Sequence, residues 1–418
     1  MLPSSRWRPR FAVWLSTSAL VLCGGIAVAD PAPPFQILAQ QSQGAPRLAE
    51  ADAAVAQAQG LARQAAARPN PTVGVVVENF SGSSPFQGFA RAETTASIEQ
   101  PLELGGKRPA RIAAGRAEVT AAQARAAQAR ANFAFDLADA YARAEAADRR
   151  LALANDSFHL AEDDQRIAGA LVRAGKEADV RAVQAKAALQ AARADIDEAR
   201  ADRASAFAKL SALAGATIPY TSLAASLLAH AERDEILSAP DPLTSPAVVS
   251  AQAVRDAAGR RVRVERTRAA PDVTVSLGVR RLAGENATAM VGGVSAPLPI
   301  FDRNRGAVSA AQAELRGAEA RLAAARLDAE ADARASAVRA VAAQSRIQAV
   351  REGESAAAEA YRLTRLGYQG GKLPLSELLT ARRALADAQT QTLDAQLERL
   401  SAEAALARLR GVIPFGDQ

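Results

Sequence analysis

Two stretches of the chain alternate between more polar and less polar positions. Residues 91–99 and residues 272–280 place their less polar side chains at every second position, which is the period at which side chains share one face of a β-strand. Residues 72–80 and 288–297 are weaker candidates, and in the first of these Val76 falls out of phase. Turns rich in glycine and polar residues separate the members of each pair. The pattern predicts two β-hairpins, each with one apolar and one polar face.

Four much longer segments have the pattern of helices. Residues 107–165, 177–214, 303–368 and 375–410 are rich in Ala, Arg, Glu, Leu and Gln, which is the composition of long helices and coiled coils. They contain no proline except Pro109, which lies in a first turn where proline is tolerated. At 1.5 Å per residue the first would be roughly 90 Å long. Because large apolar residues are few, we expect these helices to pack through alanine into a thin wall with two wet faces.

The chain is an internal duplication. Residues 101–108 and 297–304, which read PLELGGKR and PLPIFDRN, lie 196 positions apart. The same spacing recurs over more than a hundred residues, as in the pairs Ala117 and Ala313, Gly175 and Gly371, Leu213 and Leu409, and Gly215 and Gly411. Pro71 and Pro271 lie 200 positions apart, and the difference falls in a loop between strands, where changes of length are tolerated.

The duplication defines the organisation of the chain. We expect a first repeat over residues 30–215, a linker or equatorial segment over residues 216–245, and a second repeat over residues 246–418. In each repeat a glycine-containing turn joins the two long helices into an antiparallel hairpin, because glycine adopts the left-handed backbone that such a turn needs. The equivalent turns, residues 173–176 and 369–374, should lie at one level and form a single tip.

The four predicted strands have two possible settings. They could be two hairpins on a soluble core, although the chain has few large apolar residues to build one. Alternatively, they could span a membrane, where every backbone amide must be paired and where only helices and closed barrels are viable. Barrels begin at about eight strands, so in that setting several chains would have to contribute to one barrel.

The N-terminus reads as a secretory signal peptide over residues 1–29. Three arginines precede an apolar stretch at residues 11–28, which ends in the small-residue sequence Ala27-Val28-Ala29. The alternative is a membrane anchor, for which the stretch is short. Cys23 follows Leu22, where a lipoprotein signal would have a small residue, so we place Cys23 in the core of the leader. Beyond the leader, no stretch approaches the length of a transmembrane helix.

Composition narrows the possible chemistry. The chain has one Cys and two His among 418 residues, which excludes a disulfide framework and Cys-based or His-rich metal sites. His159 and His230 have no second His at ligand spacing. Residues 169–176 resemble a phosphate-binding loop, but Glu177 stands where Ser or Thr should follow. The sequence pI of 9.9 includes three leader arginines and gives little reason to expect nucleic acid. We therefore expect no catalytic group, no cofactor and no enzyme activity.

Several of these features together resemble the outer membrane efflux protein (TolC-like) family. They are the signal peptide, the duplicated strand pair and helical hairpin, and short motifs at residues 100–108, 297–304, 361–371 and 377–379. The first junction, which continues to Arg111, is most similar to the CzcC-type branch that serves heavy-metal resistance pumps. The resemblance implies a mainly α fold with a membrane β-barrel. Each protomer would supply four strands and long helical hairpins to a homotrimer with a twelve-stranded barrel and a periplasmic α-barrel.

The resemblance also implies a function. The chain would be a passive exit duct in outer-membrane lipid with a periplasmic extension. Its partners would be a periplasmic adaptor and an inner-membrane transporter of the resistance-nodulation-division type, and heavy-metal cations would be its cargo. The hairpin tips that contact the adaptor would lie at Arg173, Gly175, Lys176, Gly370, Gly371 and Lys372.

An acidic pair narrows the entrance in this family. Its first member falls on Glu377, but its second falls on Thr380, which departs from the pattern. Three copies of Glu377 around one axis would attract cations. Glu377 could equally be an acid in the first turn of a helix after Ser376, where the helix dipole favours it.

Other functions remain open at this stage. Within the same fold, the chain could serve multidrug efflux or type I protein secretion. A periplasmic adaptor would need an all-β domain that the sequence does not show, and an exported coiled-coil protein would not need two amphipathic strand pairs.

Overall fold

The computed structural model describes residues 31–232 and 240–416, so the expected signal peptide, with Cys23, lies outside the described residues. The longer elements follow in this order along the chain: α1 (Phe35–Gln41), α2 (Pro46–Ala66), β1 (Thr72–Glu78), β2 (Glu93–Leu102), α3 (Lys107–Arg173), α4 (Asp179–Ala214), α5 (Pro246–Arg268), β3 (Val273–Leu282), β4 (Ala287–Ser295), α6 (Arg305–Gln369) and α7 (Leu375–Arg410). Short 3-10 helices stand at η1 (Ser42–Gly44), η2 (Gly88–Arg91), η3 (Leu228–Glu232) and η4 (Pro242–Thr244).

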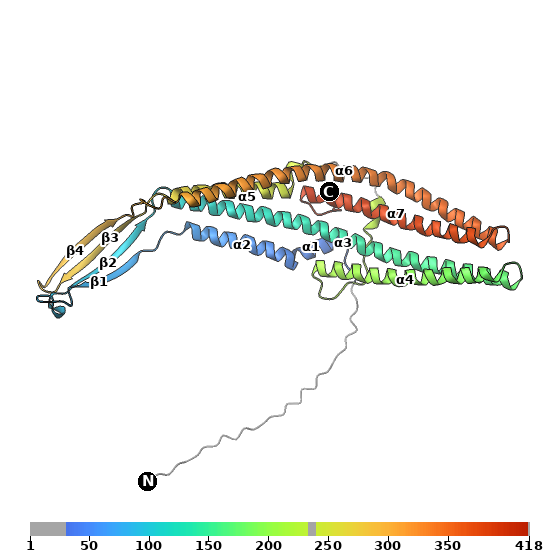
Figure 1. The fold of residues 1–418 in the computed structure, drawn as a ribbon, viewed down its shortest axis with the longest axis horizontal. Helices are drawn as coiled ribbons and strands as arrows, with labels where there is room; N and C mark the ends of the chain where they lie inside the picture. Colours follow the sequence, from blue (N-terminus) through green and yellow to red (C-terminus); the bar gives the residue numbers. More distant parts are fainter. Residues whose placement is uncertain (1–30, 233–239, 417–418) are drawn as a thin grey trace, which may run out of the picture.

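The elements form an elongated molecule with the sheet at one end (Figure 1). Helices α3 and α6 run from the sheet to the far end, where the α3–α4 and α6–α7 turns lie close together. Helices α2 and α5 flank the half next to the sheet, and α4 and α7 flank the half next to the turns. At 1.5 Å per residue, the 67 residues of α3 span about 100 Å. The predicted combination of four strands with two long helical hairpins is confirmed.

The sheet separates apolar from polar side chains. All neighbouring strands are antiparallel, in the order β1-β2-β3-β4. One row crosses the whole sheet from Val75 through Ala96 and Val279 to Met290. Val75, Val279 and Met290 are 65%, 44% and 78% exposed. The single chain therefore leaves a continuous apolar sheet face uncovered.

The other face of the sheet is polar and internally paired. Arg280 on β3 donates from Nη1 to Glu93 Oε2 at 2.9 Å and from Nε to Thr95 Oγ1 at 2.9 Å. Its Nη2 lies 3.3 Å from Glu78 Oε2. These bonds tie β1, β2 and β3 together on the side away from the apolar face. Strands β1 and β4 are the two outer strands, and each has one unpaired edge in the described chain.

Most element bounds lie within one or two residues of the sequence expectation, and the end of one helix differs by more. Helix α3 continues past the expected end near Gln165 to Arg173, because residues 166–173 contain no proline and Ile167 and Leu171 pack into the tip. Strand β2 begins at Glu93 rather than at residue 91, because Arg91 ends the short helix η2.

Alanine makes close helix packing possible. The buried residues of α3 are mostly alanines, among them Ala121, Ala126 and Ala144. Where α3 crosses α2, a Cβ added at Gly115 would lie 3.1 Å from Ala62 Cα, so the two backbones nearly touch. In residues 31–232 and 240–416, no helix combines the length and the apolar character that a membrane span requires.

A compact apolar cluster lies halfway along the helices. Phe35 of α1 packs edge-on against Tyr141 of α3, with ring centroids 5.9 Å apart. The Tyr141 hydroxyl donates to the Ala225 carbonyl oxygen at 2.7 Å. Glu145 of α3 accepts hydrogen bonds from the backbone N–H groups of Leu227 and Leu228 at 2.7 and 3.0 Å. The segment that follows α4 is thus fastened to the side of α3.

Candidate functional site at the helical tip

The two tip turns have the same backbone. After α3, the N–H of Lys176 donates to the Leu171 carbonyl oxygen at 2.9 Å, and after α6 the N–H of Lys372 donates to the Gly367 carbonyl oxygen at 2.9 Å. Gly175 has φ +70° and Gly371 has φ +69°, a left-handed conformation that glycine adopts without steric cost. Both turns are Schellman motifs, which satisfy the last carbonyl groups of each helix.

The expected tip residues lie together and are accessible. The set consists of Arg173, Gly175, Lys176, Gly370, Gly371 and Lys372, and every member is exposed. The two turns stand side by side at the end of the molecule opposite the sheet (Figure 1). They present a small surface with backbone and cationic groups that a partner could contact.

An apolar cluster holds the helices together behind the turns. Tyr368 of α6 and Leu375 and Leu378 of α7 are at most 1% exposed. They pack with Ala168 of α3 and Ala185 of α4. All four long helices therefore contribute to one small core behind the turns.

A buried polar group lies within the same region. Asp164 of α3 is 1% exposed. The Tyr361 hydroxyl of α6 donates to its Oδ1 at 3.3 Å, and Arg382 Nη1 of α7 lies 3.7 Å from its Oδ2. Burial raises the pKa of Asp164 against the opposing attraction of Arg382. Three helices thus meet at one carboxyl group whose charged form is poorly solvated.

The neighbouring aspartate, Asp163, has a lowered pKa where that of Asp164 is raised. Asp163 lies at the surface, where it pairs with Arg166 of its own helix and accepts a hydrogen bond from Arg365 of α6 at 2.6 Å. The hydrogen bond from Arg166 is the main cause of its lowered pKa, and Arg365 lowers it further. The pair of aspartates therefore makes one solvated and one buried link between α3 and the second repeat.

Glu377 and Thr380 both lie near the start of α7 and are exposed. Glu377 is in the first turn, where the helix dipole favours a carboxylate. The Thr380 hydroxyl donates to the Ser376 carbonyl oxygen at 2.8 Å. The helix begins at Leu375 after Pro374, and no side chain caps it. Glu377 is therefore free to face solvent or a second chain.

Sequence reasoning did not assign a role to Asp164, Arg365 or Arg382. Asp164 was the most detectable of these residues. It interrupts an apolar stripe formed by Leu160, Ile167 and Leu171, and a carboxylate on the buried stripe of a helix requires a partner. The sequence does not reveal that this partner is Arg382, because the contact depends on how the two repeats pack against each other.

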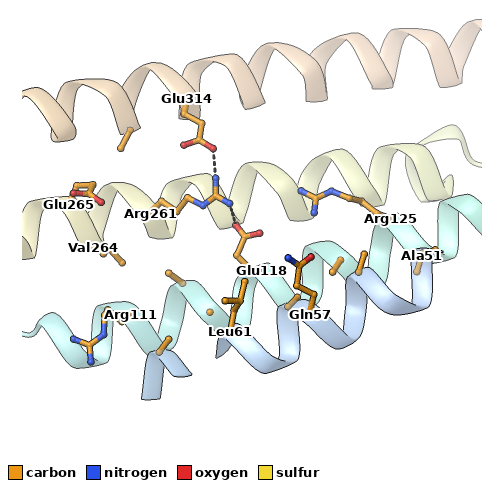
Figure 2. Close-up of a pocket in the computed structure, with 18 of the residues that line it drawn as sticks. Ala51, Gln57, Leu61, Arg111, Glu118, Arg125, Arg261, Val264, Glu265 and Glu314 are labelled. Carbon is orange, nitrogen blue, oxygen red and sulfur yellow. Dashed lines mark hydrogen bonds and ion pairs between the residues drawn. The ribbon is translucent and has the colours of Figure 1, made fainter. Parts of the chain in front are cut away.

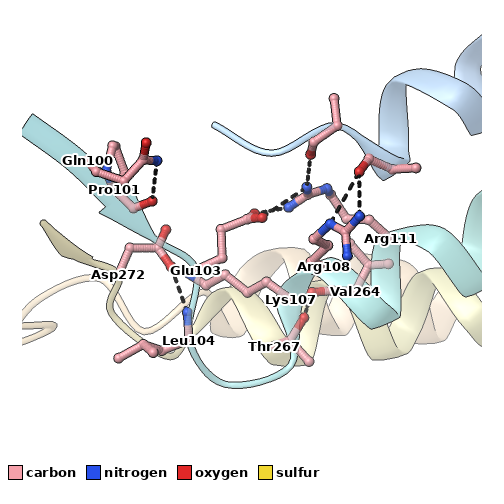
Figure 3. A network of polar contacts seen from close by, with 12 residues as sticks. Gln100, Pro101, Glu103, Leu104, Lys107, Arg108, Arg111, Val264, Thr267 and Asp272 are labelled. Atoms are coloured by element: carbon pink, nitrogen blue, oxygen red, sulfur yellow. Dashed lines mark hydrogen bonds and ion pairs between the residues drawn. The ribbon is translucent and has the colours of Figure 1, made fainter. Parts of the chain in front are cut away.

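A second polar network fixes the junction between sheet and helices. Lys107 Nζ lies 2.7 Å from Asp272 Oδ1, and Glu103 pairs with Arg111. Arg108 donates to the Ala66 carbonyl oxygen at 3.0 Å from Nη2. Figure 3 shows how these groups join the end of β2 to the segments that enter β1 and β3. The junction of the first repeat is thus anchored on both sides within one chain.

A groove lies over the helices next to this junction. It has a volume of about 990 Å³ and is lined by α2, α3, α5 and α6. Arg261 of α5 reaches across it between Glu118 of α3, at 2.8 Å, and Glu314 of α6 (Figure 2). Most of its other lining residues are alanines and paired charges.

Metal-ligating side chains do not gather in the part of the chain that the structure describes. No group of three or more His, Cys, Asp or Glu residues there could hold a metal ion. His159 is largely exposed, with Nδ1 3.7 Å from Glu162 Oε2, whereas His230 lies 3.3 Å from Glu403.

The sequence matches a known family over most of its length. Residues 37–216 and 243–412 match the profile described as "Outer membrane efflux protein". The nickel-cobalt-cadmium resistance protein NccC of Alcaligenes xylosoxydans xylosoxydans is 43% identical over 98% of this chain and 93% of its own length. The nickel and cobalt resistance protein CnrC of Cupriavidus metallidurans is 46% identical over 77% of this chain and 76% of its own length. The cobalt-zinc-cadmium resistance protein CzcC of the same organism is 31% identical, with 84% of each chain covered.

Solved structures have the same fold. The outer membrane channel CmeC of Campylobacter jejuni superposes with a TM-score of 0.78 at 14% identity, covering 92% of this chain and 87% of CmeC. The outer membrane protein VceC of Vibrio cholerae superposes with a TM-score of 0.73 at 22% identity, covering 91% and 96%. The arrangement of four strands and long helical hairpins is therefore that of these outer membrane proteins.

Proposed function

Because the chain belongs to the outer membrane efflux protein family, we propose that it is the outer-membrane exit duct of a tripartite pump for divalent metal cations. It lies in the outer membrane with a periplasmic extension and acts as a passage rather than as an enzyme. The observation that carries the proposal is the uncovered apolar face of the sheet, which runs from Val75 to Met290. In a chain of this family such a face would lie against lipid.

In a membrane, the sheet would need additional copies of the chain. In lipid an unpaired strand edge leaves backbone groups unsatisfied at a cost of several kcal/mol each. Strands β1 and β4 each have such an edge. Three chains would bring twelve strands to one closed barrel, and the three sets of helices would continue it as a tunnel through the periplasm. The apolar faces would then meet lipid, and the paired charges around Arg280 would face the lumen.

The metal substrate is supported by the relatives. NccC, CnrC and CzcC are named for resistance to nickel, cobalt, cadmium or zinc. In this chain the cargo would be Ni²⁺, Co²⁺ or a related divalent cation. Because no metal-ligating cluster stands among the described residues, selection of the cation would rest mainly with the inner-membrane transporter, which we expect to be of the resistance-nodulation-division type.

The tip would receive the other components of the pump. Its six exposed turn residues, Arg173, Gly175, Lys176, Gly370, Gly371 and Lys372, would contact a periplasmic adaptor. Glu377, on the first turn of α7, would line the entrance. Three copies would form a single carboxylate ring, because Thr380 replaces the second acid.

Metal tolerance tests the proposal. A strain that lacks this chain should lose tolerance to Ni²⁺, Co²⁺ or Cd²⁺ and should accumulate the cation, and the intact chain should restore both properties. Tolerance to dyes and antibiotics, measured in parallel, separates metal efflux from multidrug efflux. Unchanged metal tolerance together with lost drug tolerance would contradict the metal assignment.

A further inference from the structure

Two consecutive arginines of β3 belong to opposite faces of the sheet. Arg280 and Arg281 are neighbours in the strand, and successive side chains of a strand alternate between its faces. On the polar face, Arg280 lies 2.9 Å from Glu93 Oε2 and 3.3 Å from Glu78 Oε2. On the apolar face, the side chain of Arg281 makes one hydrogen bond in the described ranges 31–232 and 240–416, from Nη2 to Asn286 Oδ1 at 3.3 Å, and no ion pair. The charge of Arg281 is therefore uncompensated in its own chain.

Arg281 is also isolated among apolar side chains. The apolar face consists of every second residue of each strand, which are the positions 73–77 of β1, 94–102 of β2, 273–281 of β3 and 288–294 of β4. Apart from Arg281, these positions hold apolar residues, glycine, threonine and a single glutamine, Gln100. The strands thus carry one charge on this face, and a charge in apolar surroundings requires a partner.

The position of Arg281 along the strand is informative. The helices leave the sheet from the end at Leu102 and Val273, and Arg281 is near the other end (Figure 1). A strand rises about 3.4 Å per residue, so Arg281 stands about 27 Å along β3 from Val273. With the tilt of about 40° in membrane barrels, this is roughly 20 Å of height in an apolar band about 25 Å tall. Because the helices extend into the periplasm, Arg281 falls near the outer edge of that band.

Aromatic side chains gather at the same end of the sheet. Phe80 and Phe89 belong to the loop that joins β1 to β2, where their rings stack with centroids 6.1 Å apart. They remain 49% and 71% exposed. Aromatic residues form girdles at the two edges of the apolar band of a membrane barrel. The loop therefore supports the placement of Arg281 at the level of the lipid headgroups.

The cross-strand neighbours of Arg281 are two threonines. Thr94 on β2 and Thr288 on β4 stand opposite Arg281 in the same row of the apolar face, where Cβ atoms of neighbours are about 4.5–5.5 Å apart. Both threonines are exposed, and neither hydroxyl takes part in a hydrogen bond within the described part of the chain. One row thus combines a guanidinium group with a hydroxyl on either side. A guanidinium group matches the oxygens of a phosphate group in a bidentate contact.

We propose that Arg281, Thr94 and Thr288 bind the phosphate of a lipid headgroup in the outer leaflet. The next row of the same face, which includes Val279 and Met290, lies against the acyl chains of that lipid. The phosphate supplies the counter-charge that Arg281 lacks, whereas a free phosphate ion would leave the apolar row without a contact. The inference rests on the proposed function, which places the apolar face of the sheet against lipid.

A lipid titration of the assembled protein tests the site. The protein is isolated from outer membranes in a non-ionic detergent, freed of lipid and titrated with lipid A, an acylated glucosamine disaccharide with two phosphate groups. Native mass spectrometry counts the bound lipid. We expect Arg281→Gln to weaken binding at least about tenfold, because it removes a hydrogen bond between two charged groups. The matched control, Arg280→Gln, removes the same charge at the same height from the other face and should bind like the unmodified chain.

A second variant tests the site without a change of charge. Thr94→Val combined with Thr288→Val removes both hydroxyl groups and should weaken binding about threefold or more. If Arg281→Gln failed to assemble, this variant would decide, and unchanged affinity in it would overturn the site. Inorganic phosphate, added at the same concentration as the lipid, should not displace it. Displacement by inorganic phosphate would show that the site takes the free anion and would overturn the lipid assignment.

The remaining outcomes separate this inference from the proposed function. Equal affinity of the unmodified chain and Arg281→Gln would overturn the lipid site, and so would equal weakening by Arg280→Gln. In both cases a trimer in the outer-membrane fraction would leave the proposed channel standing. A monomeric chain outside the outer-membrane fraction would overturn the proposed function together with the lipid site.

Discussion

The buried carboxyl group of Asp164 offers a quantitative test of how the tip is held. We consider Asp164→Ala, which removes the partner of Tyr361 and Arg382. Arg382 would then remain buried, with a side chain only 8% exposed, without its counter-charge. Removing one member of a buried ion pair costs about 3–5 kcal/mol.

The geometry places the expected cost at the lower end of that range. Arg382 and Asp164 are 3.7 Å apart, which is beyond a hydrogen bond, and burial outweighs the arginine in setting the aspartate pKa. We therefore expect a loss of about 3 kcal/mol in the free energy of local opening, which corresponds to roughly 100-fold faster amide exchange. Hydrogen exchange with mass spectrometry on peptides that cover residues 160–171 measures this rate in the assembled protein.

Two further variants make the result decisive. Asp163→Ala removes only a surface pair and should change exchange by less than about fivefold, because such pairs contribute at most about 1 kcal/mol. Asp164→Ala combined with Arg382→Met replaces both charges by apolar groups and should return exchange close to that of the unmodified chain. If Asp164→Ala exchanged no faster than Asp163→Ala, the buried group would not hold the tip.

The raised pKa of Asp164 also predicts a pH dependence. A carboxyl group with a folded pKa above its ordinary value of 3.8 favours folding in its neutral form. This contribution is complete below the ordinary pKa and is lost as the pH rises through the folded pKa. After correction for intrinsic rates, tip amides should open less readily at acidic pH. Asp164→Asn should remove the dependence, and a dependence that survives in this variant would assign it to another group.

Three other changes probe the sheet, the middle of the helices and the entrance. Leu277→Arg on the apolar face of β3 should reduce the amount of assembled protein in the outer membrane, at a cost of about 2–4 kcal/mol per chain. The control Ser276→Arg, on the polar face of the same strand, should not reduce it. Equal yields of the two variants would contradict the assignment of the apolar face to lipid. Glu145→Ala leaves the N–H groups of Leu227 and Leu228 without an acceptor, at about 1–3 kcal/mol, so limited proteolysis after α4 should accelerate. Glu377→Ala should change cation block in planar bilayers, and unchanged block at several salt concentrations would remove Glu377 from the pore.

Much of the fold could be read from periodicity and repetition. The alternation at residues 272–280 predicted an amphipathic strand, and the spacing between Gly175 and Gly371 predicted two equivalent turns. Periodicity alone located the helix ends less well: α3 continues past the expected end near Gln165 to Arg173, where the tip turn with the left-handed Gly175 ends it.

The polar interior of the tip was harder to predict than its turns. Asp164, Tyr361 and Arg382 come from three helices, and their contact depends on how one repeat docks on the other. A single sequence shows that a carboxylate interrupts an apolar stripe, but not which distant arginine faces it. The place of Glu377 in the first turn of α7 could be predicted, because it depends only on position within one helix.

The most direct test of the central claim is to isolate the mature chain from the outer-membrane fraction and record its activity in planar lipid bilayers. We expect the chain to be a trimer that conducts ions in discrete current steps. The Leu277→Arg variant should fail to assemble and should form no channels. Recovery of the intact chain as a soluble monomer that conducts no ions would contradict the account.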